Sequence, residues 1–417
     1  MPISTISPET LYVLNSFSFL IHGVLVMFMA AGFAMLEAGL VRTKNVATIC
    51  LKNIALYSLA GVMFWVSGYN LMYLNVEGGL IGSLLPWVGD TSAVKTGDYS
   101  AGYTAHSDWF FQMVFVATTA SIISGTIAER IKLWPFLLFV AVLAGFLYPV
   151  QGAWQWGGGW LAELGFSDFA GSTIVHSAGG WAALAGAIIV GPRKGKYTRD
   201  GHIAPIPGSS LPLATLGTFI LWFGWFGFNG GSQLALGSGA DVTAMSIIYA
   251  NTNMAAAGGV LAVMALTQLV YGKVDLSMVL NGALAGLVSI TAGPDTPEIW
   301  QAILIGGVGG GIVVFAVPLL DRFHLDDVVG AIPVHLCAGI WGTLAVPLTN
   351  PDASLMTQII GIVAIGAFML IGSLVVWYLI DKLVGIRVSE EEEFEGMDKI
   401  ELGLEAYPEF GHGSQKI

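Results

Sequence analysis

Long runs of apolar residues follow one another from Leu11 almost to Leu379, and charged residues are largely confined to the stretches between them. Most runs are long enough for a helix that crosses a membrane. The alternating ten-residue segments of a transmembrane β-barrel do not occur. The run at 276–293 is the weakest, because it is short and carries Asn281. The pattern predicts an all-α polytopic membrane protein with eleven transmembrane helices at about 11–40, 46–75, 109–131, 133–153, 169–191, 211–235, 243–272, 276–293, 299–320, 331–349 and 355–381.

The basic residues alternate with these spans. Lys95 is the one basic residue assigned to a loop on the opposite side from the rest. Because cytoplasmic loops attract Lys and Arg, the N-terminus is expected outside and the C-terminus inside. The other basic residues follow the odd-numbered spans: Arg42, Lys44, Lys52, Arg130, Lys132, Arg193, Lys194, Lys196, Arg199, Lys273, Arg322, Lys382, Arg387, Lys399 and Lys416.

Composition agrees with a membrane protein and narrows its function. Apolar residues make up 55% of the chain and charged residues 11%, against roughly 25% charged residues in soluble domains. The net charge of −12 comes from acids in loops and in the tail, and without a basic patch we expect no nucleic-acid partner. Cys50 and Cys337 lie in apolar runs, so we interpret them as small buried hydrophobes. No basic residue precedes Arg42, so the first run is expected to be retained rather than cleaved as a signal peptide.

Two histidines occupy matching places in the two halves of the chain. His176 and His335 each lie inside an apolar span, with Val before them and Gly four residues after. An ionisable group at membrane depth is costly and suggests function, although a buried hydrogen-bonded packing residue is the alternative for either alone. Because His335 lies five spans after His176, the direction of the chain is reversed, and the regions 11–191 and 211–349 are expected to be inverted repeats. Transporters commonly place their site between such repeats, so the two histidines should meet.

The remaining histidines carry less weight. His22 lies within the first span without a visible partner, and we interpret it as a packing or lipid-facing residue. The sequence alone does not assign a role to the acid Glu37 in the same span. Four other histidines lie in loops or the tail: His106, His202, His324 and His412.

Several long motifs resemble those of the ammonium transporter (Amt/Mep) family, which is distantly related to Rhesus proteins. The resemblance covers nearly the whole chain. The motifs are Gly39-Leu-Val-Arg-Thr-Lys-Asn45, Gly125-Thr-Ile-Ala-Glu-Arg130, Asp168-Phe-Ala-Gly-Ser-Thr-Ile-Val-His176, Gly224-Trp-Phe-Gly-Phe-Asn-Gly-Gly-Ser232 and the tail segment Arg387-Val-Ser-Glu-Glu.

The resemblance implies a fold and an activity. It implies a transmembrane ammonium-conducting domain over 1–386, with the last helix at 355–381 outside the repeats, and a cytoplasmic regulatory tail over 387–417. The expected assembly is a homotrimer in the cell membrane, surrounded by lipid. The expected activity is uptake of ammonium, with methylammonium as an analogue and no cofactor. A PII-type signalling protein is an expected partner of the tail, although the acidic run at 390–393 is also typical of plain solvated charge.

The family's site residues can be carried over position by position. His176 and His335 resemble its twin pore histidines. Trp156 and Ser232 resemble two walls of the external ammonium site, and Asp168 the acid beside it. A further pair, Phe115 and Phe228, resembles the stacked gating phenylalanines. Two departures concern the cytoplasmic side: Gly330 stands where some members carry Asp, and Leu402 where His is frequent.

These residue types suit the separation of ammonium from potassium. Aromatic faces bind a weakly hydrated cation by about 0.5–2 kcal/mol per ring, and the Ser232 hydroxyl can accept an N–H that potassium lacks. Phe111 and Phe115, like Phe228 and Ser232, are four residues apart and share a helix face. A core-packing role is the alternative for the phenylalanines. Histidine can accept and donate a proton near neutral pH, so two facing imidazoles could line the pore and relay a proton. Asp168 could cap its helix or support the bound cation electrostatically.

Two other functional classes remain as alternatives. A sensor could use the same ammonium site to signal, but the tail of about 35 residues is short for an output domain. A membrane haem protein could use paired histidines, yet only His22, His176 and His335 lie at membrane depth and no Cys-x-x-Cys-His motif occurs. We expect a transporter rather than an enzyme.

Overall fold

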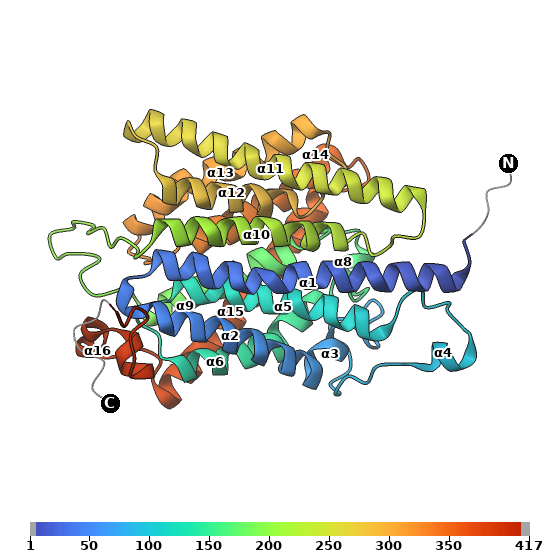
Figure 1. Cartoon of the computed structure of the whole chain (residues 1–417), viewed down its shortest axis with the longest axis horizontal. Helices are drawn as coiled ribbons and strands as arrows, with labels where there is room; N and C mark the ends of the chain where they lie inside the picture. Colours follow the sequence, from blue (N-terminus) through green and yellow to red (C-terminus); the bar gives the residue numbers. More distant parts are fainter. Residues whose placement is uncertain (1–5, 410–417) are drawn as a thin grey trace.

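The computed structural model describes residues 6–409, and this part of the chain is helical without a β-sheet. Its long helices run approximately along one direction and form a single bundle (Figure 1). The first half contains α1 (Pro8–Leu40), α2 (Val46–Met63), α5 (Ala105–Thr126), α6 (Leu133–Val142) and α9 (Ala178–Val190). The second half contains α10 (Leu211–Gly231), α11 (Gly239–Tyr271), α12 (Leu276–Ile290), α13 (Ile299–Arg322) and α14 (Ala338–Thr349), followed by α15 (Leu355–Val384).

Several of these helices contain or adjoin a wider π-helical turn. The turn η2 (Phe64–Gly68) leads from α2 into α3 (Tyr69–Tyr73), and η3 (Leu143–Leu147) leads from α6 into α7 (Tyr148–Ala153). The turns η4 (Ser172–Ser177) and η5 (Ile332–Cys337) begin α9 and α14. The short elements are η1 (Thr43–Asn45), α4 (Ser92–Thr96), α8 (Trp160–Glu163), α16 (Glu390–Glu395) and η6 (Asp398–Leu402).

Ten helices of the described chain are long and apolar enough to cross a membrane. They coincide with ten of the eleven predicted spans, which establishes a polytopic helical membrane protein. The exception is α12, predicted as the weakest span, with 15 residues. At 1.5 Å per residue it is about 22 Å long, shorter than the roughly 30 Å hydrocarbon core. The count of eleven therefore stays a prediction.

Capping residues move some helix starts away from the hydropathy boundaries. The helix α1 begins three residues before its predicted span because the Ser7 side chain accepts the Thr10 backbone N–H. At the start of α11, Ser238 and Asp241 form a reciprocal capping box. Such caps satisfy backbone donors at a helix start and are polar, so a search for apolar runs excludes them.

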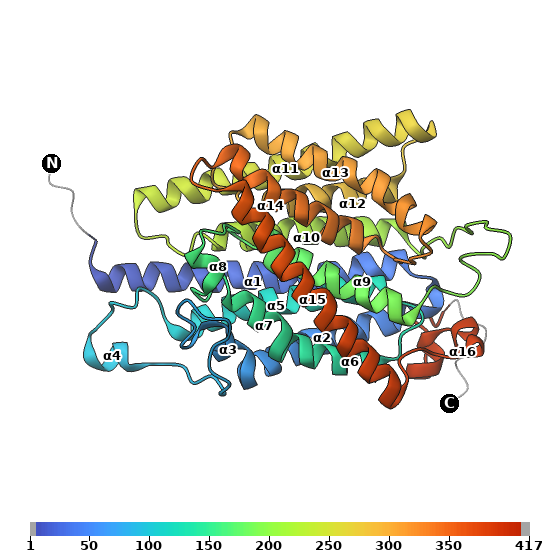
Figure 2. The same ribbon diagram turned by 180° about the vertical axis from the view of Figure 1, so that it is seen from behind.

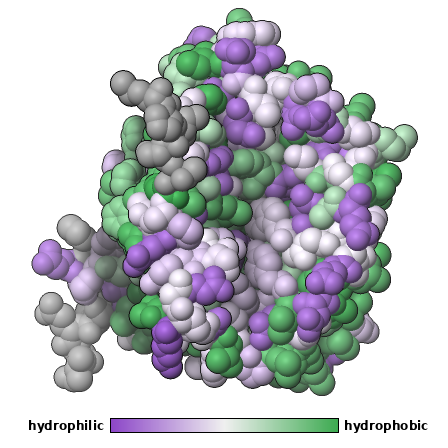
Figure 3. Space-filling model, turned by 90° about the vertical axis from the view of Figure 1, so that its right-hand side faces the viewer, coloured by the Kyte–Doolittle hydropathy of each residue, from purple (hydrophilic) through white to green (hydrophobic). Residues whose placement is uncertain are grey.

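The two ends of the bundle differ. One end carries α4 and the start of α1, and we call it the α4 end; the other carries α16 and η6, and we call it the tail end (Figures 1 and 2). Seen end-on, the α4 end presents hydrophilic and intermediate residues, with hydrophobic residues mainly toward its edges (Figure 3). In Figure 2 the long helix α15 crosses obliquely over the bundle and leads to the tail end.

The described part of the tail packs on the bundle's own helices. The Glu393 carboxylate accepts the Lys194 backbone N–H at 2.7 Å and pairs with Arg387 at 2.8 Å. The Asp398 carboxylate accepts the N–H groups of Ala47 and Thr48 and so caps α2. Both acids are buried. The interpretation of the acidic run as solvated charge is therefore wrong for Glu393, which is an anchor; residues after 409 lie outside the described chain.

Candidate functional site

A row of aromatic and imidazole rings lies inside the bundle. From the loop after α7, Trp156 meets the ring of Phe115 edge-on, with centroids 5.9 Å apart. Phe115 of α5 stacks on Phe228 of α10, at 4.1 Å between centroids and 29° between planes. Phe228 lies 5.2 Å from His176, whose ring stacks on His335 at 5.3 Å. We call these five residues the ring column, and they include five of the seven site residues predicted from the sequence.

The two histidines contact each other directly. Their Nδ1 atoms are 3.2 Å apart, and both side chains are buried. One Nδ1 must carry the proton and the other must accept, so the pair holds one ordered N–H···N hydrogen bond. The predicted meeting of His176 and His335 is confirmed. Their role in transport stays a prediction.

The histidine segments are built alike. Each His lies in a π-helical turn, and each turn begins after an Asp eight residues earlier. Asp168 accepts four backbone N–H groups, those of residues 171 to 174. Asp327 accepts the N–H groups of Gly330 at 3.1 Å and Ile332 at 2.7 Å. Of the two roles expected for Asp168, the structure shows the helix cap. Both carboxylate oxygens accept hydrogen bonds in this cap.

Gly330 is one of the departures from the family pattern. Its backbone conformation explains why glycine occupies this position. Its φ is +80°, and the corresponding residue after Asp168, Gly171, has a φ of +109°. Glycine adopts positive φ without the Cβ clash that other residues meet there. Each glycine lets the chain turn from the capping Asp into the histidine helix.

The two segments cross closely at the glycines that follow the histidines. A Cβ on Gly180 would lie 2.7 Å from the Leu336 backbone nitrogen, and one on Gly339 would lie 2.5 Å from Ser177 Oγ. Leu336 and Ser177 are the residues directly after the two histidines. Small residues at such contacts let helices approach in a membrane. The glycine four residues after each His, noted in the sequence, therefore provides room for the other histidine segment.

Trp156 and Ser232 lie at the part of the column nearer the α4 end. Trp156 is half-buried and its Nε1 donates to the Asp168 carbonyl at 3.0 Å. Ser232 is also half-buried and lies one helical turn beyond Phe228, whose carbonyl accepts its hydroxyl at 2.8 Å. Because that bond uses the hydroxyl proton, the lone pairs of Ser232 Oγ stay available as acceptors.

Sequence reasoning missed Trp225. Its ring stacks on His176, with centroids 4.8 Å apart and planes 18° apart, and its Nε1 donates to Thr291 Oγ1. The signal was its position three residues before Phe228, which places both rings on one face of α10. Trp225 fixes one side of the histidine pair.

His22 is a packing residue. It is buried, its Nδ1 is 2.8 Å from the Ser18 carbonyl oxygen, and its Nε2 is 3.1 Å from the Tyr249 hydroxyl. The alternative of a lipid-facing histidine is wrong. The partner, Tyr249, is 227 residues away in sequence, which is why none was visible.

Two cavities lie on the tail-end side of the histidines. A small one of about 10 Å³ is lined by His335 and Glu37, among others. A wider one of about 560 Å³ is lined by Arg193, Asp327 and loop residues. Asn281 and Val329 line both cavities, so the two are neighbours between the histidine pair and the tail end.

Buried ion pairs join the loops at the tail end. The Glu129 carboxylate pairs with Arg42 and with Arg193, and Arg193 also pairs with Asp326 at 2.8 Å. Burial raises the pKa of Glu129, but the Arg193 and Arg42 guanidinium groups outweigh it and hold that pKa below its usual value. The same balance of burial against Arg193 and Arg130 lowers the pKa of Asp326. Both acids therefore stay ionised near neutral pH.

A haem bound between the histidines does not fit this geometry. The imidazoles are hydrogen-bonded to each other directly, and the aromatic rings of Trp225 and Phe228 pack against His176. A macrocycle would have to replace all of these contacts.

The fold and the site together define a polytopic α-helical membrane protein with a buried row of aromatic and imidazole rings. The Ammonium Transporter Family model matches residues 17–407. Ammonium transporter Amt2 of Archaeoglobus fulgidus is 42% identical, covering 94% of this chain and 87% of its own length. A solved structure described as a Sensor Amt Protein matches with a TM-score of 0.88 and 33% identity, covering 95% of this chain and all of that one. Candida albicans Mep2 matches with a TM-score of 0.81 and 27% identity, over 98% of this chain and 94% of that chain.

The chain belongs to the ammonium transporter family. It is accordingly a multi-pass membrane transport protein rather than an enzyme, as predicted from its motifs.

Proposed function

We propose that this protein takes up ammonium by binding it at the α4 end, removing a proton, and passing ammonia along the histidine pair. The single observation that carries the proposal is the ring column, which leads from the half-buried Trp156 to the buried pair His176–His335. A transporter of the ammonium family needs both a cation site and an apolar passage, and the column offers residues for each.

Recruitment uses the aromatic part of the column. Trp156 offers a π face, Ser232 Oγ a hydrogen-bond acceptor, and Phe115 a further ring. Ring faces attract the cation, and the hydroxyl favours a species with N–H groups over potassium. Asp168 adds negative charge nearby, although its main contacts are to backbone N–H groups. The stacked rings of Phe115 and Phe228 then close the passage as a gate.

Deprotonation of ammonium lowers the free-energy cost of crossing the apolar passage. Moving an intact cation through an apolar passage costs several kcal/mol, whereas ammonia avoids most of that cost. The ordered His176–His335 hydrogen bond can receive a proton at one ring and release it at the other, since each imidazole both accepts and donates. A proton can therefore follow the ammonia, which would make uptake electrogenic.

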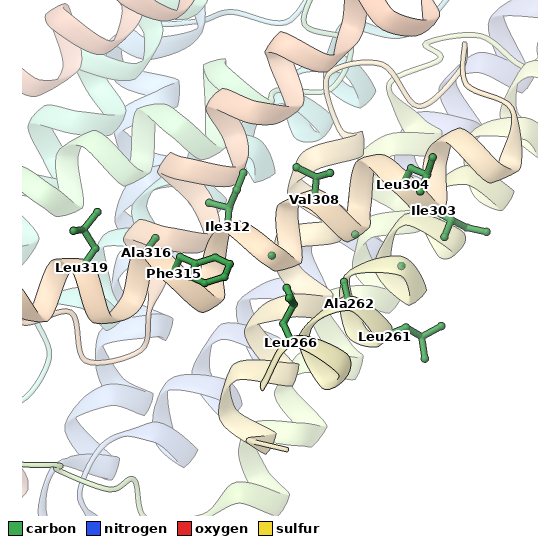
Figure 4. Close-up of a pocket in the computed structure, with 13 residues that line it drawn as sticks. Leu261, Ala262, Leu266, Ile303, Leu304, Val308, Ile312, Phe315, Ala316 and Leu319 are labelled. Carbon is green, nitrogen blue, oxygen red and sulfur yellow. The ribbon is translucent and has the colours of Figure 1, made fainter. Parts of the chain in front are cut away.

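The assembly we propose is a homotrimer. An apolar groove of about 920 Å³ lies between α11 and α13 (Figure 4), and its floor includes the small residues Gly258, Ala262, Gly307 and Gly311. Small residues let a further helix approach closely in lipid. The exposed stripe of α1, with Phe17, Leu20, Val24 and Phe28, offers bulky side chains of matching character. We assign the groove to the α1 stripe of a neighbouring copy.

The distribution of basic residues indicates the orientation of the protein in the membrane and its cellular location. Apart from Lys95, the basic residues of the described chain belong to loops and helix ends on the tail side, so we assign the tail end to the cytoplasm and the protein to the cell membrane. The ten helices before α15, including the short α12, would form two inverted five-helix repeats, which the matched Asp–Gly–His segments support. The docked tail would be where a PII-type protein meets the transporter.

A sensor is the second candidate function. The similarity to the structure described as a Sensor Amt Protein, at 33% identity, favours it. A transporter and a sensor differ in what they produce when ammonium binds. A transporter carries ammonium flux without a partner, whereas a sensor that does not transport would bind ammonium and show no flux.

Replacement of both histidines by leucine tests the transport mechanism. His176→Leu with His335→Leu keeps the passage apolar but removes both proton-accepting rings. Ammonium-driven current in proteoliposomes should fall at least tenfold, while some uptake of neutral ammonia or methylamine remains.

The comparison includes the parent protein in potassium, where we expect no current. Replacement of either histidine by Asp should instead let potassium carry current, because a fixed charge then attracts any small cation. Full ammonium-selective current in the double leucine variant would contradict the relay, and absence of ammonium-dependent flux in the parent would contradict transport itself.

A further inference from the structure

Glu37 is a buried acid with an unused oxygen on the tail-end side of the histidine pair. It lies near the end of α1 and is 1% exposed. Its Oε2 accepts Ser124 Oγ at 2.7 Å and Asn53 Nδ2 at 3.3 Å. Its Oε1 is buried and has no hydrogen-bond partner within residues 6–409. Since a buried oxygen without a partner is costly, this arrangement indicates a further ligand such as water.

A lysine stands beside this acid. Lys52 of α2 is 2% exposed, and its Nζ donates to the Ser124 carbonyl at 3.0 Å, so Ser124 contacts both charged groups. The ammonium also lies 4.6 Å from the centre of the Phe136 ring. Arg130 is a further positive charge close enough to interact with Lys52. Burying two charged groups is costly and rarely gains stability over apolar residues of similar size, so stability alone does not explain their presence.

The small cavity joins Glu37 to His335. Both residues line it, together with Phe33, Ser121, Asn281 and Val334. Its volume of about 10 Å³ is close to the space that one water molecule needs, and such a water requires at least two polar partners. Glu37, His335, Ser121 and Asn281 offer them. From here the wider cavity of about 560 Å³ continues toward the tail end past Asn281 and Val329.

We propose that Glu37 is the proton acceptor that follows His335 in transport, reached through one water in the small cavity. This inference rests on the proposed transport function. The imidazolium of His335 gives a proton to the water, and the water gives one of its own to Glu37 Oε1. The products are a neutral imidazole, an unchanged water and a carboxylic acid. The acid then returns its proton to water in the small cavity, and this proton passes to water in the wider cavity, with which the small one shares Asn281 and Val329. Lys52 favours the return of the carboxylate to its charged form.

The test compares charge with uptake in the same proteoliposomes. Glu37→Gln keeps the size of the side chain but removes the proton acceptor. Ammonium-driven or methylammonium-driven current and uptake of labelled methylammonium are measured on the full-length assembled protein. We expect the charge moved per methylammonium taken up to fall at least tenfold. Glu37→Asp keeps an acid but moves it one methylene away, so its ratio should lie between those of the parent and the Gln variant.

Glu129→Gln is the matched control, because Glu129 is also a buried acid at the tail end but lines neither cavity. It should leave the charge-to-uptake ratio at the parent's value even if less protein assembles. A parental ratio in Glu37→Gln would overturn the inference, including the case in which current and uptake fall together. If the Gln variant does not assemble, the Glu37→Asp variant decides the test. A charge-to-uptake ratio equal to the parent's in that variant would also overturn the inference. Failure of the proposed function is distinct, since the parent itself would then show no ammonium-dependent flux.

Discussion

The carboxylate of Glu129 is buried, and the guanidinium groups of Arg42 and Arg193 keep it ionised. Its Oε1 also accepts the Arg42 backbone N–H at 2.6 Å, so one side chain joins the end of α1 to the loop after α5. Arg193 extends the connection to Asp326. Removing one partner of a buried pair leaves an uncompensated charge, which costs about 3–5 kcal/mol.

This cluster predicts how stability depends on pH. Because the pKa of Glu129 is lower in the folded chain than in the unfolded chain, its contribution is present above the unfolded value of about 4.3 and is lost as the pH falls through the folded value. The thermal midpoint should stay nearly constant from pH 7 to about 5 and fall below about pH 4. Glu129→Gln should lower the midpoint at pH 7 and flatten the acid slope, as measured by intrinsic fluorescence during heating. An unchanged slope would mean that other acids control it.

Single residues of the site were predictable when their chemistry was conspicuous in the sequence. His176 and His335 stood out because an ionisable group inside an apolar run is rare, and Asp168 because it precedes such a run. Trp225 and Glu37 did not, because their importance comes from neighbours distant in the sequence, such as His176 for Trp225 and His335 for Glu37. Asp327 could have been found by aligning the two histidine segments, since its spacing to His335 equals that of Asp168 to His176.

At the scale of the element, hydropathy located the helices and polar chemistry located their ends. The ten long helices coincide with predicted spans, while α1 and α11 start earlier because Ser7 and Ser238 cap them. The π-helical turns of the two histidine segments left no trace in hydropathy, since a wider turn changes backbone bonding without changing composition. Their crossing depends on two positions without a Cβ, Gly180 and Gly339.

Alanine at either crossing glycine should therefore separate the two histidine segments. A Cβ on Gly180 would come within 2.9 Å of three Leu336 atoms, two of them backbone, and overpacking of this kind costs about 1–3 kcal/mol. Gly180→Ala and Gly339→Ala should lower the thermal midpoint and reduce ammonium-driven flux. Gly61→Ala is the control, because its nearest neighbour, Met113 Sδ, would be at an ordinary 3.5 Å. Equal effects at all three positions would show that the crossing has no special role.

At the scale of the whole molecule, one end carries the docked tail, and the other carries α4 and its long loop (Figure 1). Most of the basic residues belong to loops and helix ends on the tail side. The sequence predicted this separation from the alternation of Lys and Arg. Which end faces the cytoplasm is a property of the membrane and not of the chain's internal contacts, so orientation needs a direct experiment. The same holds for assembly, because a single chain leaves the α11–α13 groove open.

Cysteine labelling tests the orientation. A cysteine at Ser100, near Asp98, should react with an impermeant thiol reagent added to intact cells. A cysteine at Arg199, in the loop after α9, should react only after the membrane is opened. Modification of both positions in intact cells would contradict the expected topology.

Filling the groove tests the assembly. At Gly307 a side chain would extend over open space, since only Gly258 and Ala262 lie near its Cβ, so Gly307→Leu should leave the chain folded while blocking a neighbouring copy. Native mass spectrometry should show trimers for the parent and smaller species for this variant. Val375→Leu, on the exposed face of α15, should leave the trimer intact. Trimers of normal stability in Gly307→Leu would place the interface elsewhere.

The crossing at Gly180 and Gly339 also has a consequence for biogenesis. The histidine ring that completes the pair enters the membrane 159 residues after the first, so during synthesis His176 waits without its partner while the four helices α10 to α13 are made. The first half of the chain must therefore persist in the bilayer as an incomplete bundle, with Ser172, Ser177 and His176 lacking their final neighbours. We expect insertase or chaperone assistance to matter most in this interval, before the second histidine segment arrives to close the structure.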